Sequence, residues 1–365
     1  MNYQMKSVPK SVKVLINIPD INSAGGVSNH FLGLKDKFRY NVIYNTIGGK
    51  SRRRFFLFRQ AFDYVKFMMV LKSDKPNIVH LNPSLDPKAI LREAGFLLIA
   101  KLIFRKKVLV FFHGWKIDYS AKISLRYSEL FRRVFNLADV FCTLALAFQR
   151  ELISWGIEKP IYIETTKVDD NLLTDFGEKD LYRHRLNILF LSRVERYKGI
   201  YELLRAYMFL KRKYQDITLS IAGVGSELSQ VKTWVSSKQI KDVNFLGFVR
   251  DREKIETFRD GSIYVLPTYS EGLPTSLLEA MAFGLPVVTC PVGGIQDFFE
   301  NGKMGFLVKS SNVEDLRSSL EKLIVNEALR IRISLYNYGY AKKRFLASIV
   351  ARRLEKIYDQ MLNGY

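Results

Sequence analysis

The sequence predicts an α/β chain made of two Rossmann-like, doubly wound domains. Its 365 residues exceed the length of a typical single hydrophobic core, so two domains are expected. Short apolar runs alternate with amphipathic segments along most of the chain, a pattern typical of parallel strands joined by helices. The alternation lapses in one polar, charged stretch around residues 164–185 and then restarts. Ligands of such domains bind at the carboxyl ends of the strands.

We place the first domain at residues 1–168, the second at 169–345, and a terminal helix at 346–365. Strands of the first domain are expected at 12–18, 41–45, 77–81, 108–112 and 140–143, and helices at 52–72, 87–104 and 121–137. Strands of the second domain are expected at 187–191, 217–222, 243–246, 263–266, 286–289 and 305–308, and a helix at 200–213. The tail from 316 to 362 is expected to contain helices only.

The positive charge of the chain is concentrated in its first half. The formal net charge is +21, and residues 1–168 hold 28 Lys and Arg against 12 Asp and Glu, a net +16. This asymmetry predicts an anionic membrane surface or a polyanion as partner. Segments 52–71 and 100–112 mix cations with large apolar residues, which fits either a helix on an anionic membrane or a core stripe with a solvated basic face. Nucleic acid is disfavoured because no recognition module accompanies the charge.

Cysteine, histidine and hydropathy patterns point to a cytoplasmic protein without a metal site. The two cysteines lie in apolar runs and are expected to be buried thiols in a reducing compartment. The four histidines are scattered, and no Asp-x-Asp occurs. The start of the chain lacks a signal-peptide core, and charges interrupt the longest apolar stretch, at 95–112, so no membrane span is expected.

The stretch 270–288 follows an apolar run at 263–266 and predicts a strand, a glycine-bearing turn and a helix. Gly272, Leu273 and Pro274 form the turn, and Thr275 or Ser276 is expected to cap the helix. Unpaired amides and the helix dipole make this start an anion site.

Two carboxylates, Glu271 and Glu279, flank this predicted anion site and suit hydrogen bonds to sugar or ribose hydroxyls. The spacing from Ser276 to Glu279 also fits a capping box, which is a purely structural role. Glu271 precedes the helix, so a function in the loop is more plausible for it.

Other candidates also follow strands. Gly25 and Gly26 permit positive φ and close ligand approach, or form an ordinary tight turn. His113 ends a strand, where it could hydrogen-bond a substrate hydroxyl or satisfy loop backbone. Arg193 and Lys198 lie on a loop before a helix and could straddle a diphosphate, or form a solvated charged loop. Two weaker candidates, from permissive or apolar strand ends, are Gly223 and Val249.

Together these motifs resemble glycosyltransferase family 4, the retaining, nucleotide-sugar-dependent enzymes of the GT-B fold. The run Glu271-Gly272-Leu273-Pro274-Thr275-Ser276-Leu277-Leu278-Glu279 is similar to the family's Glu-x7-Glu signature. Ser192-Arg193 with Lys198-Gly199 is similar to its basic pair, although Ser192 stands where a glycine is usual. Pro291-Val292-Gly293-Gly294, Gly25-Gly26 and His113-Gly114 match further family positions.

The resemblance implies a role for each of these residues. Arg193 and Lys198 would hold the donor diphosphate, Glu279 the ribose, and Glu271 the donor sugar. The backbone amides from Leu273 to Ser276 would meet the phosphates. His113 would contact the donor sugar or assist the acceptor, and Gly25-Gly26 would border the acceptor. The terminal helix would cross back to the first domain, and no metal or other cofactor would be required.

The expected function is retaining transfer of a sugar from a nucleoside diphosphate sugar to a hydroxyl of a glycan, expected to be lipid-linked, in the synthesis of cell-surface polysaccharide or glycolipid. The expected location is cytoplasmic and peripheral, on the inner face of the membrane. The alternative from another class is a GT-B protein that binds a glycan or nucleotide without transfer. A sugar phosphorylase is the second enzyme alternative, but it needs a phosphate pocket or a cofactor lysine that the sequence does not offer.

Overall fold

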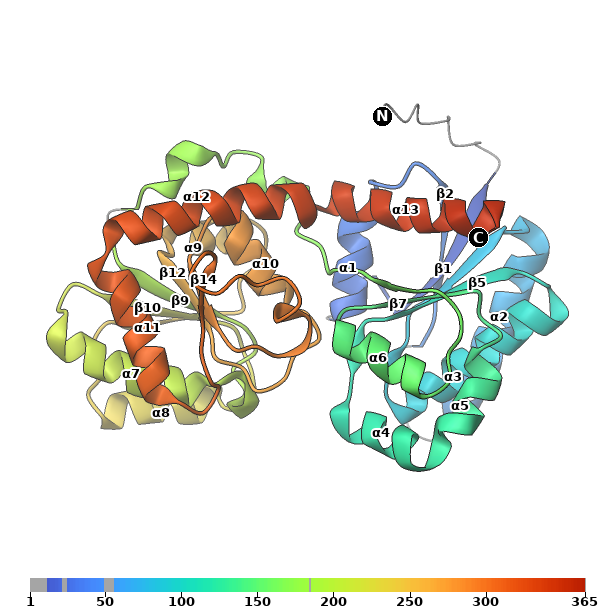
Figure 1. Ribbon diagram of the computed structural model, residues 1–365, viewed down its shortest axis with the longest axis horizontal. Helices are drawn as coiled ribbons and strands as arrows, with labels where there is room; N and C mark the ends of the chain where they lie inside the picture. Colours follow the sequence, from blue (N-terminus) through green and yellow to red (C-terminus); the bar gives the residue numbers. More distant parts are fainter. Residues whose placement is uncertain (1–11, 22–24, 49–55, 184, 365) are drawn as a thin grey trace. The chain divides into compact units, whose positions relative to one another are not determined.

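The computed structural model describes residues 12–21, 25–48, 56–183 and 185–364. Its chain forms two compact units (Figure 1). The first unit comprises Met1–Thr166 together with Ala347–Tyr365, and the second comprises Lys167–Leu346. Both units are built from a parallel sheet and helices, as the alternating sequence pattern predicts.

The first unit contains a parallel sheet with the order β2-β1-β3-β5-β7-β8. Its strands are β1 (Lys13–Ile18), β2 (Asn41–Thr46), β3 (Ile78–Leu81), β5 (Lys107–Phe112), β7 (Val140–Thr143) and β8 (Ile161–Ile163). Five of them confirm predicted strands, whereas the half-buried β8 was not predicted. Two short strands, β4 (Ser84–Leu85) and β6 (Gly114–Trp115), pair separately. The strand order reverses between β1 and β3, where α/β sheets bind ligands.

Helices of the first unit differ from the predicted ones mainly in their continuity. They are α1 (Gly26–Leu34), α2 (Phe56–Asp74), α3 (Pro87–Leu98), α4 (Ile117–Lys122), α5 (Ser128–Phe135) and α6 (Leu146–Ser154). The helix predicted at 87–104 ends in a π-helical turn, η2 (Ile99–Ile103). The single helix predicted at 121–137 is wrong, because a second π-helical turn, η3 (Ile123–Tyr127), separates α4 from α5. Residues 52–55 of the predicted basic helix lie outside the described residues.

The terminal helix α13 (Ala347–Asn363) belongs to the first unit and lies beside α1 (Figure 1). Its inner face is apolar and buried, and polar contacts fix its register. Arg353 forms an ion pair of 2.9 Å with Glu164, and the Tyr358 hydroxyl lies 2.7 Å from Nδ1 of the buried His80. These contacts join residues that are far apart in the sequence, so α13 completes the core of this unit.

The second unit has a parallel sheet with the order β11-β10-β9-β12-β13-β14. Its strands are β9 (Asn187–Leu191), β10 (Thr218–Ala222), β11 (Val243–Gly247), β12 (Ile263–Leu266), β13 (Val287–Thr289) and β14 (Gly305–Leu307). All six confirm predicted strands. The order reverses between β9 and β12, so the loops after these two strands flank the position where this sheet type binds its ligand.

The predicted helix at 200–213 is confirmed as α7, and the helical tail is also confirmed. The helices of the second unit are α7 (Ile200–Lys213), α8 (Leu228–Ser237), α9 (Asp251–Asp260), α10 (Thr275–Ala282), α11 (Val313–Val325) and α12 (Glu327–Arg344).

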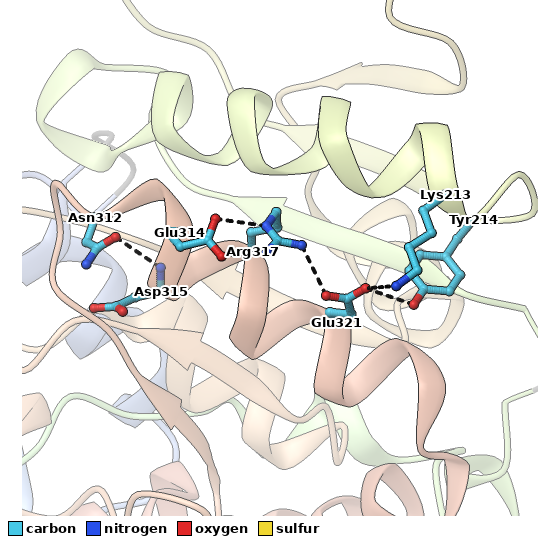
Figure 2. A network of polar contacts seen from close by, with 7 residues as sticks. All are labelled: Lys213, Tyr214, Asn312, Glu314, Asp315, Arg317 and Glu321. Carbon is cyan, nitrogen blue, oxygen red and sulfur yellow. Dashed lines mark hydrogen bonds and ion pairs between the residues drawn. The ribbon is translucent and has the colours of Figure 1, made fainter.

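A polar network joins α11 to the end of α7 (Figure 2). The Glu321 carboxylate accepts hydrogen bonds from Lys213 Nζ at 2.8 Å and from the Tyr214 hydroxyl at 2.9 Å. Arg317 forms an ion pair with the other oxygen of Glu321 at 3.2 Å. Asn312 accepts from the Asp315 amide at 3.0 Å and thereby caps α11. Ion pairs that keep contact with solvent contribute little stability singly.

Candidate functional site

The carboxyl edge of the second sheet brings the predicted donor residues of this unit together. Arg193 and Lys198 lie in the segment between β9 and α7, and Glu271 lies in the segment between β12 and α10. The strands β9 and β12 are direct neighbours, although the corresponding loops are far apart in sequence. The strand order reverses between β9 and β12, so the two loops lie on either side of the crevice in which doubly wound sheets bind ligands.

Lys198 and Glu271 form an ion pair in which Lys198 Nζ donates a hydrogen bond to Glu271 Oε1. Their side chains are only 8% and 11% exposed. Taking two charges out of water is costly unless each compensates the other. A ligand with both a phosphate and a hydroxyl can take over both partners, since the cation suits the phosphate and the carboxylate suits the hydroxyl.

The loop after β13 packs against the loop that carries Glu271. Gly293 has φ +54°, and a Cβ atom built on it would lie 2.1 Å from the Glu271 carbonyl oxygen. The Gly294 amide donates to the Gly272 carbonyl at 2.7 Å. On the other side of the site, Gly223 has φ +143° and lies directly against the backbone of Ser192. Glycine is required at both positions, where it allows neighbouring loops to make backbone contact.

Helix α10 begins at Thr275 and has no side-chain cap. Its N-cap residue is Pro274, so the predicted cap by Thr275 or Ser276 is wrong. The Ser276 hydroxyl instead lies 2.7 Å from the hydroxyl of Tyr264 on β12. The first amides of a helix have no partner within the helix, and without a cap they can bind an anion.

Glu279 does not form the capping box that its spacing from Ser276 suggests. It is the fifth residue of α10, two residues beyond the position from which a side chain can bond back to the cap. Its side chain is 2% exposed, and its Oε1 accepts a hydrogen bond of 2.6 Å from Lys254 on α9. Sequence reasoning missed Lys254, which lies on a helix whose exposed residues are mostly charged.

Three other donor candidates border this edge. Arg193 is exposed, and its guanidinium donates to the Tyr197 hydroxyl. The Arg193 guanidinium carbon also lies 5.8 Å from the centre of the Tyr197 ring. Val249 is half-buried between β11 and α9. Leu273 lies in the same loop as Glu271 and is buried.

His113 follows β5 in the first unit and has an uncharged imidazole at neutral pH. Its Nε2 lies 3.0 Å from Asn82 Oδ1, and Asn82 follows the neighbouring strand β3. Burial lowers the pKa of His113 to about 3. The His30 ring lies 4.9 Å from the His113 ring, centre to centre. Sequence reasoning missed Asn82, although its position directly after a strand was a usable signal.

Gly25 and Gly26 start helix α1 without adopting the positive φ that glycine permits. Gly25 is the N-cap residue with φ −174°, which is an extended conformation, and Gly26 is the first residue of the helix. A Cβ atom on Gly25 would come no closer than 3.8 Å to Ser28 Oγ, and one on Gly26 would meet nothing within 4 Å. The protein itself therefore does not require glycine here, and a role in close ligand approach stays a prediction.

The described part of the chain lacks two kinds of feature. Within it, no group of three or more His, Cys, Asp or Glu side chains is arranged to hold a metal ion. None of its helices combines the length and the apolar character that crossing a membrane requires.

Residues 174–340 match the family model described as "Glycosyl transferases group 1". The chain is 25% identical to an uncharacterized glycosyltransferase of Methanocaldococcus jannaschii, covering 74% of this chain and 72% of that protein. It is 27% identical to the putative colanic acid biosynthesis glycosyltransferase WcaL of Salmonella typhimurium, over 67% of this chain and 60% of that one. It is also 27% identical to the Campylobacter jejuni N,N'-diacetylbacillosaminyl-diphospho-undecaprenol alpha-1,3-N-acetylgalactosaminyltransferase, over 56% of this chain and 51% of that one.

The fold is similar to that of Anabaena Alr3699/HepE in complex with UDP and glucose. The TM-score is 0.72 at 17% identity, covering 95% of this chain and 99% of that one. The coverage includes both units, which confirms the predicted GT-B fold. Residues 174–340 are therefore similar to the glycosyl transferases group 1 family, in a chain that has the GT-B fold.

Proposed function

We propose that the protein transfers a sugar, with retention at the anomeric carbon, from a nucleoside diphosphate sugar to a hydroxyl of a glycan. The observation that carries this proposal is the Lys198–Glu271 pair at the strand-order reversal of the second sheet. The uncapped start of α10 lies on the same loop as Glu271. The cation and the free amides suit a diphosphate, and the carboxylate suits hydroxyls, so together they match a ligand that contains both.

Each donor residue has a distinct part in the proposal. Lys198 and the exposed Arg193 bind the diphosphate and stabilise the charge that develops on the leaving nucleotide. They supply the positive charge that a divalent ion would otherwise provide. The amides at the start of α10 bind phosphate oxygens. Glu271 exchanges Lys198 for a hydroxyl of the donor sugar, and Glu279 binds the ribose.

We propose that the acceptor attacks on the face from which the nucleotide leaves. The acceptor oxygen forms a bond to the anomeric carbon as the bond to the diphosphate oxygen breaks, and that phosphate oxygen takes the acceptor proton. The candidate that the first unit offers for contact with the reacting sugar is His113. Its described hydrogen-bond partner is the side-chain amide of Asn82, not a carboxylate that could act as a nucleophile. Trapping a covalent glycosyl-enzyme would refute this step, because retaining hydrolases with a nucleophile form such an intermediate.

Nucleotide binding is the first test of the proposal. Thermal unfolding should shift upward with UDP, GDP or ADP, because a ligand that binds only the folded state stabilises it. The responsive nucleotide also identifies the base. A shift without sugar transfer to any acceptor would favour the non-catalytic alternative, and no shift with any of the three nucleotides would contradict the donor site.

Gly293→Ala is expected to lower transfer activity by about a hundredfold, because a misplacement of about 1 Å can cost that much. The new methyl group would clash with backbone oxygen atoms of Glu271 and Gly272 at 2.1 and 2.4 Å and push their loop away from Lys198. Gly302→Ala is the matched control, since Gly302 has φ +82° and nothing within 4 Å of the added Cβ. Equal activity of the two variants would show that this loop contact does not position the site.

The first unit is proposed to dock on the cytoplasmic face of an anionic membrane, which would supply a lipid-linked acceptor. Exposed apolar residues form one stripe along α2, at Phe58, Phe62, Val65 and Met69, with exposed fractions of 77%, 65%, 43% and 64%. Exposed Leu102 and Ile103 precede the cations Arg105 and Lys106. Apolar side chains beside cations suit lipid tails and anionic headgroups. The C. jejuni relative has an undecaprenol-linked substrate in its name, which supports a lipid-linked acceptor.

Vesicle binding tests this docking. Vesicles with anionic lipid should retain the protein at low salt and release much of it at high salt, because salt screens exposed charges. The double variant Phe58→Ser, Phe62→Ser should lose most binding, whereas Phe209→Ser, which removes a half-exposed phenylalanine of the second unit, should keep it. Recovery of wild-type protein in the supernatant at every salt concentration would contradict membrane docking.

A further inference from the structure

The carboxylate of Glu279 is held by one partner, Lys254. The Lys254 ammonium lies 2.6 Å from Glu279 Oε1, and the exposed fractions of the two side chains are 20% and 2%. No other described residue forms a hydrogen bond or ion pair with the Glu279 carboxylate, although the buried Lys167 also interacts with it through its charge. Both residues lie in the second unit, on α9 and α10. A carboxylate this deeply buried is costly unless a cation compensates it.

The pair leaves one carboxylate oxygen of Glu279 uncommitted. Oε1 is occupied by Lys254, and Oε2 has no hydrogen-bond partner among the described residues. Oε2 is not fully buried, so it retains contact with solvent. A fixed carboxylate with one free oxygen can accept hydrogen bonds from vicinal hydroxyls without reorientation.

We infer that Lys254 is a positioning residue that aims Glu279 at the ribose and thereby sets the preference for ribonucleotides over 2′-deoxyribonucleotides. The inference rests on the proposed function, because it assumes a nucleotide in this site. The mechanism is preorganisation. With Lys254 in place, Oε2 meets the ribose hydroxyls at a fixed angle. A nucleotide that lacks the 2′-hydroxyl leaves this carboxylate oxygen without a full set of hydrogen bonds, and it therefore binds with lower affinity.

Removing Lys254 has a consequence that a purely stabilising ion pair does not have. In Lys254→Met, Glu279 loses its fixed orientation, so the advantage of the 2′-hydroxyl falls. If Lys254 only neutralised charge, the variant would be less stable but would still bind the ribonucleotide better than its deoxy analogue. Discrimination between two nucleotides by the same protein sample is also independent of the folded fraction.

The experiment is calorimetric titration with UDP, GDP and ADP and with the 2′-deoxy form of each. Wild-type protein should prefer one ribonucleotide over its deoxy form by about tenfold or more, which is the worth of one hydrogen bond to a charged group. Lys254→Met should reduce that ratio to below about threefold, mainly by weakening the ribonucleotide. Lys254→Arg should restore most of it. Arg252→Met is the matched control on the same helix, since Arg252 is 92% exposed and lies 4.0 Å from Glu256. It should match wild-type protein.

The outcomes separate this inference from the function on which it rests. Failure of wild-type protein to bind any of the three ribonucleotides would overturn the proposed function and the inference together. If wild-type protein binds a ribonucleotide and its 2′-deoxy form with nearly equal affinity, Glu279 has no role at the ribose and the inference alone is overturned. A wild-type ratio preserved in Lys254→Met would show that Lys254 has no positioning role.

Discussion

Lys198→Met should reduce turnover by about a hundredfold to a thousandfold, the usual cost of losing one preorganised donor to a developing negative charge. Lys198 donates to Glu271 in the structure and is proposed to transfer to the donor diphosphate. Methionine keeps most of the volume of the side chain and removes its charge. Steady-state rates with a saturating donor measure the effect on turnover.

Lys303→Met provides the control for Lys198→Met. Lys303 also forms an ion pair with a glutamate, Glu300, at 2.8 Å, but both side chains are about half exposed. This variant should change turnover by less than about twofold, because exposed pairs contribute little. A Lys198→Met enzyme with turnover close to that of Lys303→Met would mean that Lys198 does not act on the leaving group. Melting temperatures of both variants show whether a loss reflects unfolding.

The first unit should lose stability as the pH falls below about 6.5. Burial lowers the pKa of His113 to about 3 and that of His80 well below its usual value. The unfolded chain therefore binds protons near pH 6.5 that the folded unit does not accept, and stability falls as pH drops from 6.5 towards the folded pKa. The expected slope approaches about 1.4 kcal/mol per pH unit for each histidine.

Urea unfolding at pH 7.5, 6.5 and 5.5 measures this loss. Two of the three tryptophans, Trp115 and Trp155, lie in the first unit, so a Trp234→Phe background reports on that unit alone. Buried Glu93 and Glu164 have raised pKa values and act in the opposite direction. Comparison with a His80→Gln variant isolates the histidine contribution, because the free energy of unfolding should then depend less steeply on pH. Stability that rises on acidification, with no change of slope in the variant, would contradict the account.

The fold was largely predictable from the sequence because parallel strands buried on both faces appear as short apolar runs. The strand β8 was missed since its residues are only half-buried and its run is three residues long. The break between α4 and α5 was missed for a different reason. The π-helical turn at Ile123–Tyr127 changes the backbone hydrogen bonding, but it contains no glycine or proline from which the change could be predicted.

The sequence supplied candidate residues for the site but not the contacts between them. Lys198 and Glu271 were both candidates, yet their ion pair depends on the adjacency of β9 and β12, which the sequence does not state. For Glu279, the sequence spacing suggested a capping box, and the structure instead gives it Lys254 as partner. Local spacing predicts contacts within one helix well, whereas partners on different elements require the strand order.

The most direct test of the central claim is transfer from a panel of UDP-, GDP- and ADP-sugars, with the anomeric configuration of the product read by NMR. The expected result is release of one nucleoside diphosphate and a product with the configuration of the donor, both greatly reduced in Lys198→Met. A product with inverted configuration, or a Lys198→Met enzyme that transfers sugar at the wild-type rate, would contradict it.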